Sequence, residues 1–572
     1  MQINRLRIHN FRSIIDVELV IQGYVLLVGA NNAGKSNVIN AIRTFYDDIK
    51  WSDNDFPKIG AKDDEAWIEL SYALNDEEWS SLADNYKSAG DGHLLILKRH
   101  FRGKKAKAGQ SNIYAIVDGR EDNELFYGAK NVGAGKIGNI IYIPAITTPN
   151  DQMKTSGPSP LRNMLNFVLK NIVQGSTAYS AIESAFMEFN REAKQGNGFL
   201  SEITKPINEA LSDWNIDLDL SVNQISTDDI TKNLVKPSFI DKSLGDCYFE
   251  LERFGHGYQR TVMYELIKLA PSFTSDKKKI EKKEFSPDYN LILFEEPEAF
   301  LHPTQQEVMS YNLRRLSESN DQQVIVTTHS QVFVGKNSDQ LTQIVRLMKI
   351  NGASTIFQLS LDDLNDLYKD GLDLIACLEK YVNSSEANAD QIKEARKLIG
   401  EVPTDEVADQ RERFKYQIWL DSEKSAMFFA DKVLLVEGAT ERALINYLIA
   451  YQWHEFNEQK VFVVDALGKY NFHRFMRLFE KFGIPHGVLL DDDHDKGHHQ
   501  VVNNLIRSRR NQSTLSNPVF ISGCIEEMLK LHIPNRTDLK PIEVLRAIEE
   551  KKVDETVLLH FKGFVCQALG MI

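Results

Sequence analysis

Cysteine is scarce in this chain and is never clustered. The 572 residues contain four cysteines, Cys247, Cys377, Cys524 and Cys566, and no two of them form a CxxC pair. This spacing indicates neither a disulfide framework nor a zinc ribbon. Long apolar runs are also missing, because none approaches the ~18 residues of a membrane span and the N-terminus has no apolar signal core. We therefore expect a soluble cytoplasmic protein without a membrane partner.

Positive charge is in deficit. Lys and Arg number 67 against 81 Asp and Glu, which gives a net charge of -14. This balance argues against a protein that coats nucleic acid, but it permits a nucleic-acid enzyme with local basic patches. Two basic runs, 98–107 and 506–510, are candidates for phosphate contacts. The alternative for each run is a solvated charged face.

The rest of the composition is that of an ordinary globular protein. Hydrophobic residues make up 42% and charged residues 26%, which excludes a wholly disordered or collagen-like chain. At ~100–200 residues per domain, the length predicts two to four domains.

Strand-like and helix-like segments alternate along the first 350 residues, which predicts an α/β sheet. The strand candidates are 3–11, 24–29, 65–74, 93–102, 137–146, 291–298 and 322–330. Between 159 and 215, apolar residues fall at helical spacing, which predicts a helical insertion able to act as a packing or dimerisation arm.

A second α/β pattern occupies the C-terminal part. Its strand candidates are 431–438, 460–466 and 486–493, and helical segments separate them. This order predicts a small domain with a parallel sheet of its own. The charged, helical stretch 361–430 before it is interpreted as a linker or a set of packing helices.

A phosphate-binding loop is predicted at 29–36. These residues read Gly-Ala-Asn-Asn-Ala-Gly-Lys-Ser and fit G-x-x-x-x-G-K-[ST] at every fixed position. The segment follows a buried strand and precedes a helix, whose N-terminus attracts phosphate. We expect ATP to be held by Asn31, Asn32, Gly34, Lys35 and Ser36. Lys35 would reach the β- and γ-phosphates, and Ser36 would ligate Mg²⁺.

Two acids end a buried strand downstream, as the second half of such a site requires. Glu295 and Glu296 close the segment LILFEEPE. We expect Glu295 to hold the Mg²⁺ and Glu296 to activate the attacking water as a catalytic residue. His329 follows another apolar strand and fits a γ-phosphate sensor; its alternative is simple hydrogen bonding at a strand end.

A second group of acids follows the strands of the C-terminal pattern. Glu437 ends one strand, Glu441 stands on the next helix, and Asp491 and Asp493 end another strand within DDDHD. The carboxyl ends of parallel strands meet at one sheet edge, where open α/β sheets place their sites. Because clustered carboxylates repel one another unless a cation is bound, they predict Mg²⁺ or Mn²⁺. A solvated acidic loop is the alternative.

The N-terminal part resembles ABC-type ATPases, the group that contains SMC and RecF proteins. The run 252–260, ERFGHGYQR, resembles their signature loop, although His256 stands where Ser is usual. In that family the loop contacts ATP held by the opposite subunit. The resemblance therefore implies nucleotide contacts by Gly257 and Gln259 and a homodimer or higher homo-oligomer. The segments NFRS, with Arg12, and EEPEAFLHP are similar to the same proteins.

The C-terminal part resembles the Toprim domain of topoisomerases, primases and nucleases. Glu437 with Gly438 matches its first motif, and Asp491 with Asp493 matches its D-x-D motif. A chain that joins both halves looks like the OLD (overcoming lysogenization defect) family of nucleases, and the segment DALGKYNF is similar to that family's G-K-x-N segment.

Two weaker matches to the OLD family extend the predicted site. Glu526 stands at a later acidic metal ligand, for which Glu527 is the alternative. Lys562 stands where the family has a lysine near the scissile phosphate, and Lys540 competes for that role. Tyr447 and Tyr470 would matter only for topoisomerase chemistry, and the context of neither favours that.

These residues together lead to one functional hypothesis. It is an ATP-regulated, divalent-metal-dependent DNA endonuclease or nickase, with Glu437, Asp491 and Asp493 as catalytic and metal-binding residues. The resemblance also implies a role in bacterial anti-phage defence, alone or with a helicase-like protein or a reverse transcriptase and its RNA. The alternatives are a non-nucleolytic SMC/RecF-like repair ATPase that uses the Toprim half for binding only, and primase-like synthesis.

The expected domains account for the whole length. They are an ATPase domain at 1–158 and 216–360, a helical insertion at 159–215, a helical linker at 361–430 and a Toprim nuclease domain at 431–572.

Overall fold

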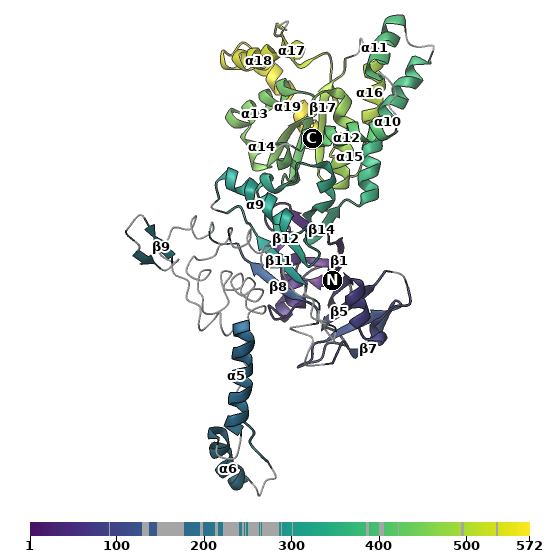
Figure 1. The fold of residues 1–572 in the computed structure, drawn as a ribbon. Helices are drawn as coiled ribbons and strands as arrows, with labels where there is room; N and C mark the ends of the chain where they lie inside the picture. Colours follow the sequence, from purple (N-terminus) through teal and green to yellow (C-terminus); the bar gives the residue numbers. More distant parts are fainter. Residues whose placement is uncertain are drawn as a thin grey trace. The chain divides into compact units, whose positions relative to one another are not determined.

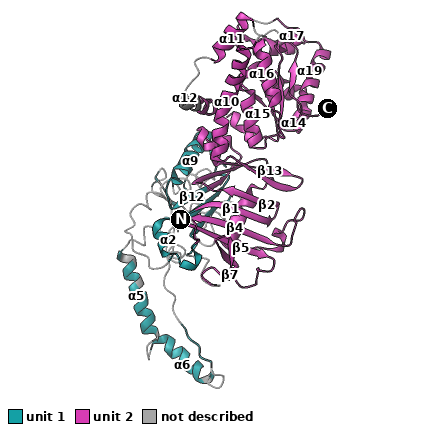
Figure 2. Cartoon of the chain, turned by 90° about the vertical axis from the view of Figure 1, so that its right-hand side faces the viewer, with its two compact units in different colours: residues 1–2, 74–87, 131–324 teal, residues 3–73, 88–130, 325–572 magenta. Residues whose placement is uncertain are grey.

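The computed structural model describes most of the chain, in two compact units (Figure 2). Outside the described set lie residues 91, 129–135, 146–176, 195–197, 212–215, 221–238, 243, 244, 246, 250–261, 263, 264, 266–284, 286, 288, 300, 385–387, 400–404, 421, 422, 494–496, 533–535 and 572. Unit 1 comprises 1–2, 74–87 and 131–324, and unit 2 comprises 3–73, 88–130 and 325–572.

An antiparallel sheet forms the N-terminal part of unit 2 (Figure 1). Its strand order is β2-β1-β4-β5-β6-β7. The bounds are β1 Gln2–Phe11, β2 Ile14–Val20, β4 Ala66–Ala73, β5 Leu94–Arg102, β6 Ile113–Val117 and β7 Arg120–Leu125. Leu6 and Ile8 are fully buried while Arg5 and Arg7 are partly exposed, which is the period of two expected for a half-buried strand.

The predicted phosphate-binding loop follows a buried strand of unit 2. This strand, β3 (Tyr24–Val28), leads through residues 29–36 into helix α1 (Lys35–Phe45). β3 pairs in parallel with β13 (Ile344–Ile350), and β13 pairs antiparallel with β14 (Ala353–Gln358). The strand–loop–helix order predicted for 24–49 is therefore confirmed.

Unit 1 contains a parallel strand pair and several helices. β8 (Asn139–Ile143) pairs in parallel with β11 (Asn290–Glu295), which confirms two predicted buried strands. The remaining bounds are α2 Asp76–Ser81, α5 Thr177–Lys194, α6 Phe199–Leu211, β9 Phe239–Asp241, β10 Cys247–Phe249 and α9 Pro303–Leu316; β12 (Gln322–Thr327) begins in this unit and ends in unit 2. Helices α5 and α6 lie within the predicted insertion, whose first part, 159–176, falls outside the described residues.

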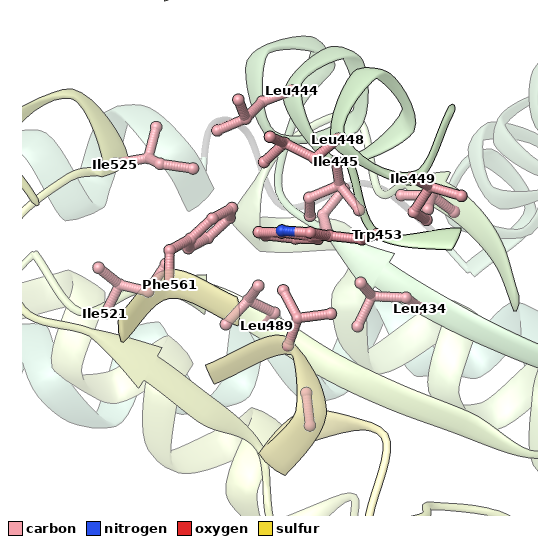
Figure 3. Close-up of a cluster of buried hydrophobic side chains, with 14 of the residues drawn as sticks. Leu434, Leu444, Ile445, Leu448, Ile449, Trp453, Leu489, Ile521, Ile525 and Phe561 are labelled. Atoms are coloured by element: carbon pink, nitrogen blue, oxygen red, sulfur yellow. The ribbon is translucent and has the colours of Figure 1, made fainter. Parts of the chain in front are cut away.

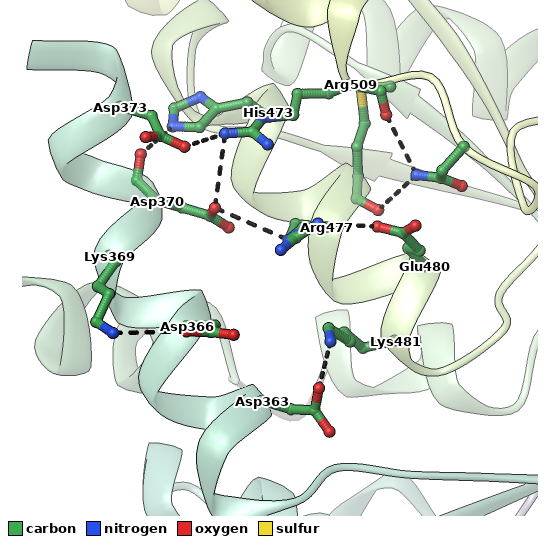
Figure 4. Close-up of polar contacts among 12 residues, drawn as sticks. Asp363, Asp366, Lys369, Asp370, Asp373, His473, Arg477, Glu480, Lys481 and Arg509 are labelled. Carbon is green, nitrogen blue, oxygen red and sulfur yellow. Dashed lines mark hydrogen bonds and ion pairs between the residues drawn. The ribbon is translucent and has the colours of Figure 1, made fainter. Parts of the chain in front are cut away.

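Helices of the 361–430 segment pack against the C-terminal part of unit 2. Their bounds are α10 Leu361–Val382, α11 Ala389–Ile399 and α12 Asp405–Trp419. Ser360 caps α10, because its Oγ accepts a 3.0 Å hydrogen bond from the Asp363 N–H. Figure 4 shows α10 joined to the helices beside it by ion pairs, including Asp370 with Arg477 and with Arg509, each at 3.9 Å. The segment is a packed helical layer.

The C-terminal part of unit 2 is built on a four-stranded parallel sheet. Its order is β16-β15-β17-β18. The strands are β15 Lys432–Val436, β16 Val461–Asp465, β17 His486–Asp491 and β18 Val519–Ile521; the helices are α13 Ala439–Tyr451, α14 His454–Glu458, α15 Phe472–Lys481, α16 Gly497–Ser508, α17 Ile525–Met528, α18 Lys540–Glu549 and α19 Glu555–Ala568. The small parallel-sheet domain that the sequence predicts is confirmed.

An apolar core fixes this sheet against its helices (Figure 3). Leu434 and Leu489 from two strands, Leu448 from α13 and Phe561 from α19 are fully buried in one cluster. The rings of Trp453 and Phe561 lie 5.8 Å apart between centroids. Full burial of such side chains stabilises the fold by ~1.5–3 kcal/mol each, so this core holds the carboxyl edge of the sheet in place.

The fold class predicted from the sequence, α/β with a Toprim-like parallel sheet, is confirmed. Within the described residues, no helix is long and apolar enough to cross a bilayer. The boundaries of the five expected segments stay predictions.

Candidate functional site

The loop at 29–36 has the backbone of a phosphate cradle. Gly29 and Gly34 have φ of 136° and 111°, which an L side chain rarely adopts. Lys35 is 6% exposed, and its Nζ donates to the carbonyl oxygens of Gly29 (2.8 Å) and Ala30 (3.1 Å). Ser36 is exposed in the first turn of α1, where helix N–H groups attract anions. The loop can therefore offer backbone N–H groups, a cation and a hydroxyl to a nucleotide.

The predicted acidic partner of this loop lies in unit 1. Glu295 ends β11, and its Oε2 accepts a 3.0 Å hydrogen bond from the Tyr142 hydroxyl. Its Oε1 is buried without a hydrogen-bond partner in the described structure, which suits a cation ligand. Glu296 follows with a φ of 46°. Because the loop and these acids belong to different units, the complete ATP site stays a prediction.

The structure describes some of the other predicted nucleotide-binding residues and leaves others outside the described set. Asn31 and Asn32 are exposed in the loop. His329 is exposed just after β12, where the neighbouring Thr328 N–H donates to the Leu27 oxygen of β3 at 3.3 Å. The signature-like run 252–260, with Gly257 and Gln259, lies outside the described residues.

The C-terminal carboxylates meet at one edge of the parallel sheet. Glu437 follows β15 and Asp491 ends β17, and these two strands are paired neighbours. Burial, reinforced by neighbouring carboxylates, raises the pKa of Glu437 to about 7 and that of Asp491 to about 8. Oε2 of Glu437 and Oδ1 of Asp491 are buried without a hydrogen-bond partner in the described structure. The charge of Lys469 offsets these raised pKa values only in part.

Asp493 turns toward a lysine and a histidine. Its Oδ2 lies 2.8 Å from His499 Nδ1 and accepts a 2.7 Å bond from the nearly buried Lys469, which also donates to the Asp491 carbonyl at 2.6 Å. The His499 contact, followed by Lys469, lowers the pKa of Asp493. Asp492 points the other way, since its Oδ1 accepts from Asn503 at 3.0 Å. Of these three consecutive acids, Asp491 and Asp493 of the D-x-D motif therefore face the carboxylate cluster, and Asp492 faces away from it.

Two more buried acids extend the cluster. Glu441 is 8% exposed and accepts a 2.9 Å bond from the Gly438 N–H. Burial raises its pKa, and Glu526 adds to the effect. Glu526 is 3% exposed and lies 3.4 Å from the ammonium of Lys540. The structure therefore brings together Glu437, Glu441, Asp491 and Asp493, and it links Glu526 to them through Glu441.

The residues at this edge fit a hard divalent cation. Carboxylate oxygens are the donors that Mg²⁺ and Mn²⁺ prefer, and the orphaned oxygens of Glu437 and Asp491 need a positive charge nearby. Among the described residues, no three acidic, histidine or cysteine side chains already surround one point as a closed metal cluster would. Lys469 is bonded to Asp493 in this arrangement.

Lys562 is placed with other partners. Its ammonium pairs with Glu455 on α14 and lies 5.9 Å from the Trp453 ring. The contacts therefore connect Lys540, and not Lys562, to the acidic cluster. The role of Lys562 at the scissile phosphate stays a prediction that this placement does not favour.

Intramolecular ion pairs occupy much of the two basic runs. In the first run, Lys105 lies 2.8 Å from Glu121 and Arg102 lies 3.8 Å from Asp53. In the second run, Arg509 pairs with Asp373, while Arg507 lies over the Phe520 ring at 4.1 Å. Arg510 is exposed. The ion pairs agree with the charged-face alternative, and contact of either run with DNA stays a prediction.

Sequence reasoning did not assign roles to Lys469 or His499. Lys469 follows β16, whose end lies at the same sheet edge, and the G-K-x-N resemblance was the available signal. Asp465, which ends β16, is nearly buried but is neutralised by Arg442 at 2.9 Å and Lys424 at 3.5 Å. His499 carries no motif, so only the fold places it beside Asp493.

Comparison with known families agrees with both halves of the chain. A family model described as an AAA ATPase domain matches residues 1–131 and 123–334, which together exceed half of the chain. This chain belongs to the AAA ATPase domain family. In this AAA ATPase, the model for the TOPRIM domain of overcoming lysogenization defect protein-like proteins matches residues 428–493. That interval contains Glu437, Glu441, Asp491 and Asp493.

Individual relatives of this AAA ATPase are nucleases by name. It is 26% identical over 508 residues to the Old nuclease of Escherichia phage P2, covering 85% of this chain and 76% of the relative. It is 20% identical to Endonuclease GajA of Bacillus cereus (strain VD045), covering 100% of this chain and 87% of the relative. Among solved structures, the SMC head domain from Thermotoga maritima is 15% identical with a TM-score of 0.28, covering 63% of this chain and 100% of that structure.

Proposed function

We propose that this AAA ATPase is an ATP-regulated, divalent-metal-dependent DNA endonuclease or nickase of the OLD type. The observation that carries the proposal is a pair of buried carboxylate oxygens, on Glu437 and Asp491, that have no hydrogen-bond partner among the described residues. They stand at the ends of neighbouring parallel strands, inside the interval matched by the Toprim model. The nuclease names of the relatives agree with this reading.

The chemistry follows from the carboxylates and the nearby lysines. Mg²⁺ or Mn²⁺ bound there supplies a water of lowered pKa and charge for the leaving oxygen. Glu437, Asp491 and Asp493 would hold the cation, and the Glu441 bond to Gly438 would fix the turn that carries Glu437. Lys540, beside Glu526, would offset the charge on the scissile phosphate.

The ATPase half supplies the regulation in this proposal. Lys35 and Ser36 would hold ATP and its Mg²⁺, with Glu295 as metal ligand, Glu296 as base and His329 as sensor. Gly257 and Gln259 would complete the site of a partner subunit in a homodimer or higher homo-oligomer. The protein would act in the cytoplasm on DNA.

The proposed biological role is anti-phage defence in bacteria. It rests on the resemblance to the OLD family, which also allows a helicase-like partner or a reverse transcriptase with its RNA. Counting plaques on bacteria that express the chain tests this role. Equal plaque numbers with the wild-type chain and with its Asp491→Asn variant, across diverse phages, would remove it.

Cleavage of supercoiled plasmid DNA in Mn²⁺ or Mg²⁺ tests the nuclease activity. Asp491→Asn removes the charge that the cation needs, so we expect the cleavage rate to fall on the order of 100-fold or more. Asp492→Asn is the matched control, because Asp492 faces Asn503 and keeps its acceptor oxygen; it should cleave like the wild type.

Two other outcomes separate the competing functions. Cleavage that survives both Asp491→Asn and Glu437→Gln would remove the nuclease assignment and leave a repair ATPase that only binds DNA. Incorporation of labelled nucleotides on a single-stranded template, lost in the same variants, would favour primase-like synthesis.

A further inference from the structure

A hairpin in unit 2 touches both the phosphate-binding loop and the Toprim-like sheet. It consists of β13 and β14, joined through Asn351 and Gly352 at φ of 51° and 86°. β13 also pairs in parallel with β3, the strand that leads into the loop, with Arg346 opposite Val28. The hairpin is thus hydrogen-bonded to the strand that carries residues 29–36.

On the side of the phosphate-binding loop, the backbone of the loop lies directly against residues of the hairpin. Ser354 is 4% exposed, and its Oγ donates to the Ala33 carbonyl at 2.8 Å and lies 2.6 Å from Ser13 Oγ. A Cβ on Gly34 would lie 2.2 Å from Ser354 Oγ, and one on Gly29 would lie 2.2 Å from the Leu347 oxygen. A shift of this loop on nucleotide binding must therefore move the hairpin or break these contacts.

On the Toprim side, one arginine of the hairpin donates hydrogen bonds to four backbone carbonyls. Arg346 is 2% exposed. Its Nε donates to Phe428 at 3.1 Å, one terminal nitrogen donates to Phe482 (3.1 Å) and Gly483 (2.9 Å), and the other donates to Ala430 at 3.1 Å. A planar guanidinium can reach all four at once, whereas a lysine ammonium has three donors on one point.

The residue across the hairpin from Arg346 reinforces the same contact. Phe357 is its register partner on β14. Its ring packs on Gly483, where a Cβ would lie 2.3 Å from the ring edge and where φ is +58°. Ser354 stands three residues before Phe357, so in a strand the two side chains face opposite sides. One strand therefore presents one face to the phosphate-binding loop and the other to the Toprim half.

The four carbonyls lie just ahead of the strands that carry the candidate catalytic acids. Phe428 and Ala430 precede β15, which leads to Glu437. Phe482 and Gly483 precede β17, which ends at Asp491. At ~3.3 Å per residue, the seven steps from Ala430 to Glu437 and the eight from Gly483 to Asp491 span at most about 23–26 Å of chain. β15 and β17 are buried and hydrogen-bonded to each other. A displacement at the N-terminal end of either strand would therefore shift the whole strand, including its C-terminal end.

We propose that the β13–β14 hairpin couples the nucleotide loop to the carboxylate site. Arg346 is the positioning residue on the Toprim side, and Ser354 is the contact on the loop side. The hairpin transmits the position of residues 29–36 to the spacing of Glu437 and Asp491. This inference rests on the proposed function, since it assumes that the chain binds ATP and cleaves DNA.

The test measures the response of cleavage to ATP in the full-length chain. The variants are Arg346→Met, which keeps length and apolar packing, Arg346→Lys, and Ser354→Ala. For each, plasmid cleavage in Mn²⁺ is followed with and without ATP, alongside binding of a fluorescent ATP analogue. Lys349→Met is the matched control, because Lys349 is exposed on the same strand.

We expect Arg346→Met and Ser354→Ala to bind the analogue but to lose the response. A wild-type response of roughly 5–150-fold, in either direction, should fall to within about twofold in both. Arg346→Lys should recover only part of it, and Lys349→Met should keep all of it. A simple loss of stability would lower the rates with and without ATP together and leave their ratio unchanged.

Two results would overturn the coupling role. One is a wild-type ratio in a folded Arg346→Met variant, and the other is a wild-type ratio in Ser354→Ala, which decides the matter if Arg346→Met does not fold. Failure of the proposed function looks different, because the wild-type chain itself would then show no cleavage or no response to ATP.

Discussion

At the scale of single residues, charge compensation separates functional side chains from structural ones. Asp465 ends β16 and Glu437 follows β15 in the same sheet, and each keeps one buried carboxylate oxygen without a hydrogen-bond partner in the described structure. Asp465 nevertheless pairs with Arg442 and Lys424, whereas the neighbouring carboxylates of Glu441 and Asp493 raise the pKa of Glu437 further. The sequence predicted the acids at this edge because strand ends are readable. It could not rank Lys540 above Lys562, since that depends on which of them the fold brings to Glu526.

The two lysines give a direct prediction at this scale. Lys540→Ala should lower the rate of plasmid cleavage by about 10–100-fold, because it removes the cation beside Glu526. Lys562→Ala should change the rate by less than about twofold, since Lys562 pairs with Glu455. The cleavage rates of the two variants, compared at equal thermal stability, show which lysine acts at the scissile phosphate. The reverse order of effects would return the phosphate-binding role to Lys562.

At the scale of elements, strands with a continuous apolar run or a clear apolar–polar alternation were predicted, including the partly exposed β1 and β5. β3, β11 and β15 consist of continuous apolar runs, a pattern that predicts buried strands. β14 reads ASTIFQ, which carries no such run, and its importance comes from contacts with residues far away in sequence. Helix α10 lies in the segment interpreted as a linker or a set of packing helices, and its acidic residues pair with Arg477 of α15 and with Arg509 just after α16 (Figure 4).

A buried carboxylate on α10 gives a prediction for stability against pH. Asp370 is 3% exposed, and burial raises its pKa to about 7, although Arg509, Arg477 and Arg474 oppose the shift and Asp373 adds to it. A raised pKa means that the folded state binds a proton more tightly than the unfolded state. Stability should therefore fall as the pH rises from about 4 to about 7, by up to about 4 kcal/mol.

Asp370→Asn removes this titrating group while keeping the shape of the side chain. The difference in melting temperature between pH 5 and pH 8 should be smaller in Asp370→Asn than in the wild type. Asp366→Asn, at an exposed position one turn earlier on α10, should behave like the wild type. Parallel melting curves for wild type and Asp370→Asn at both pH values would refute the assignment.

At the scale of the whole molecule, two sites are combined in one chain. A net charge of -14 first argued against DNA, yet part of the acid excess lies in the candidate metal site. The motifs at 29–36 and 491–493 were readable because each needs fixed residues at short spacing. Their coupling was not readable, since it runs through Arg346 and carbonyls more than 80 positions away.

The most direct test of the account is Mn²⁺-dependent nicking of supercoiled plasmid, with and without ATP, by the wild type, Lys35→Ala and Asp491→Asn. The account predicts that the wild type nicks DNA at a rate that ATP changes. Lys35→Ala should bind no nucleotide and show no change with ATP, and Asp491→Asn should not nick DNA under either condition. A full ATP response in Lys35→Ala, or wild-type nicking by Asp491→Asn, would contradict it.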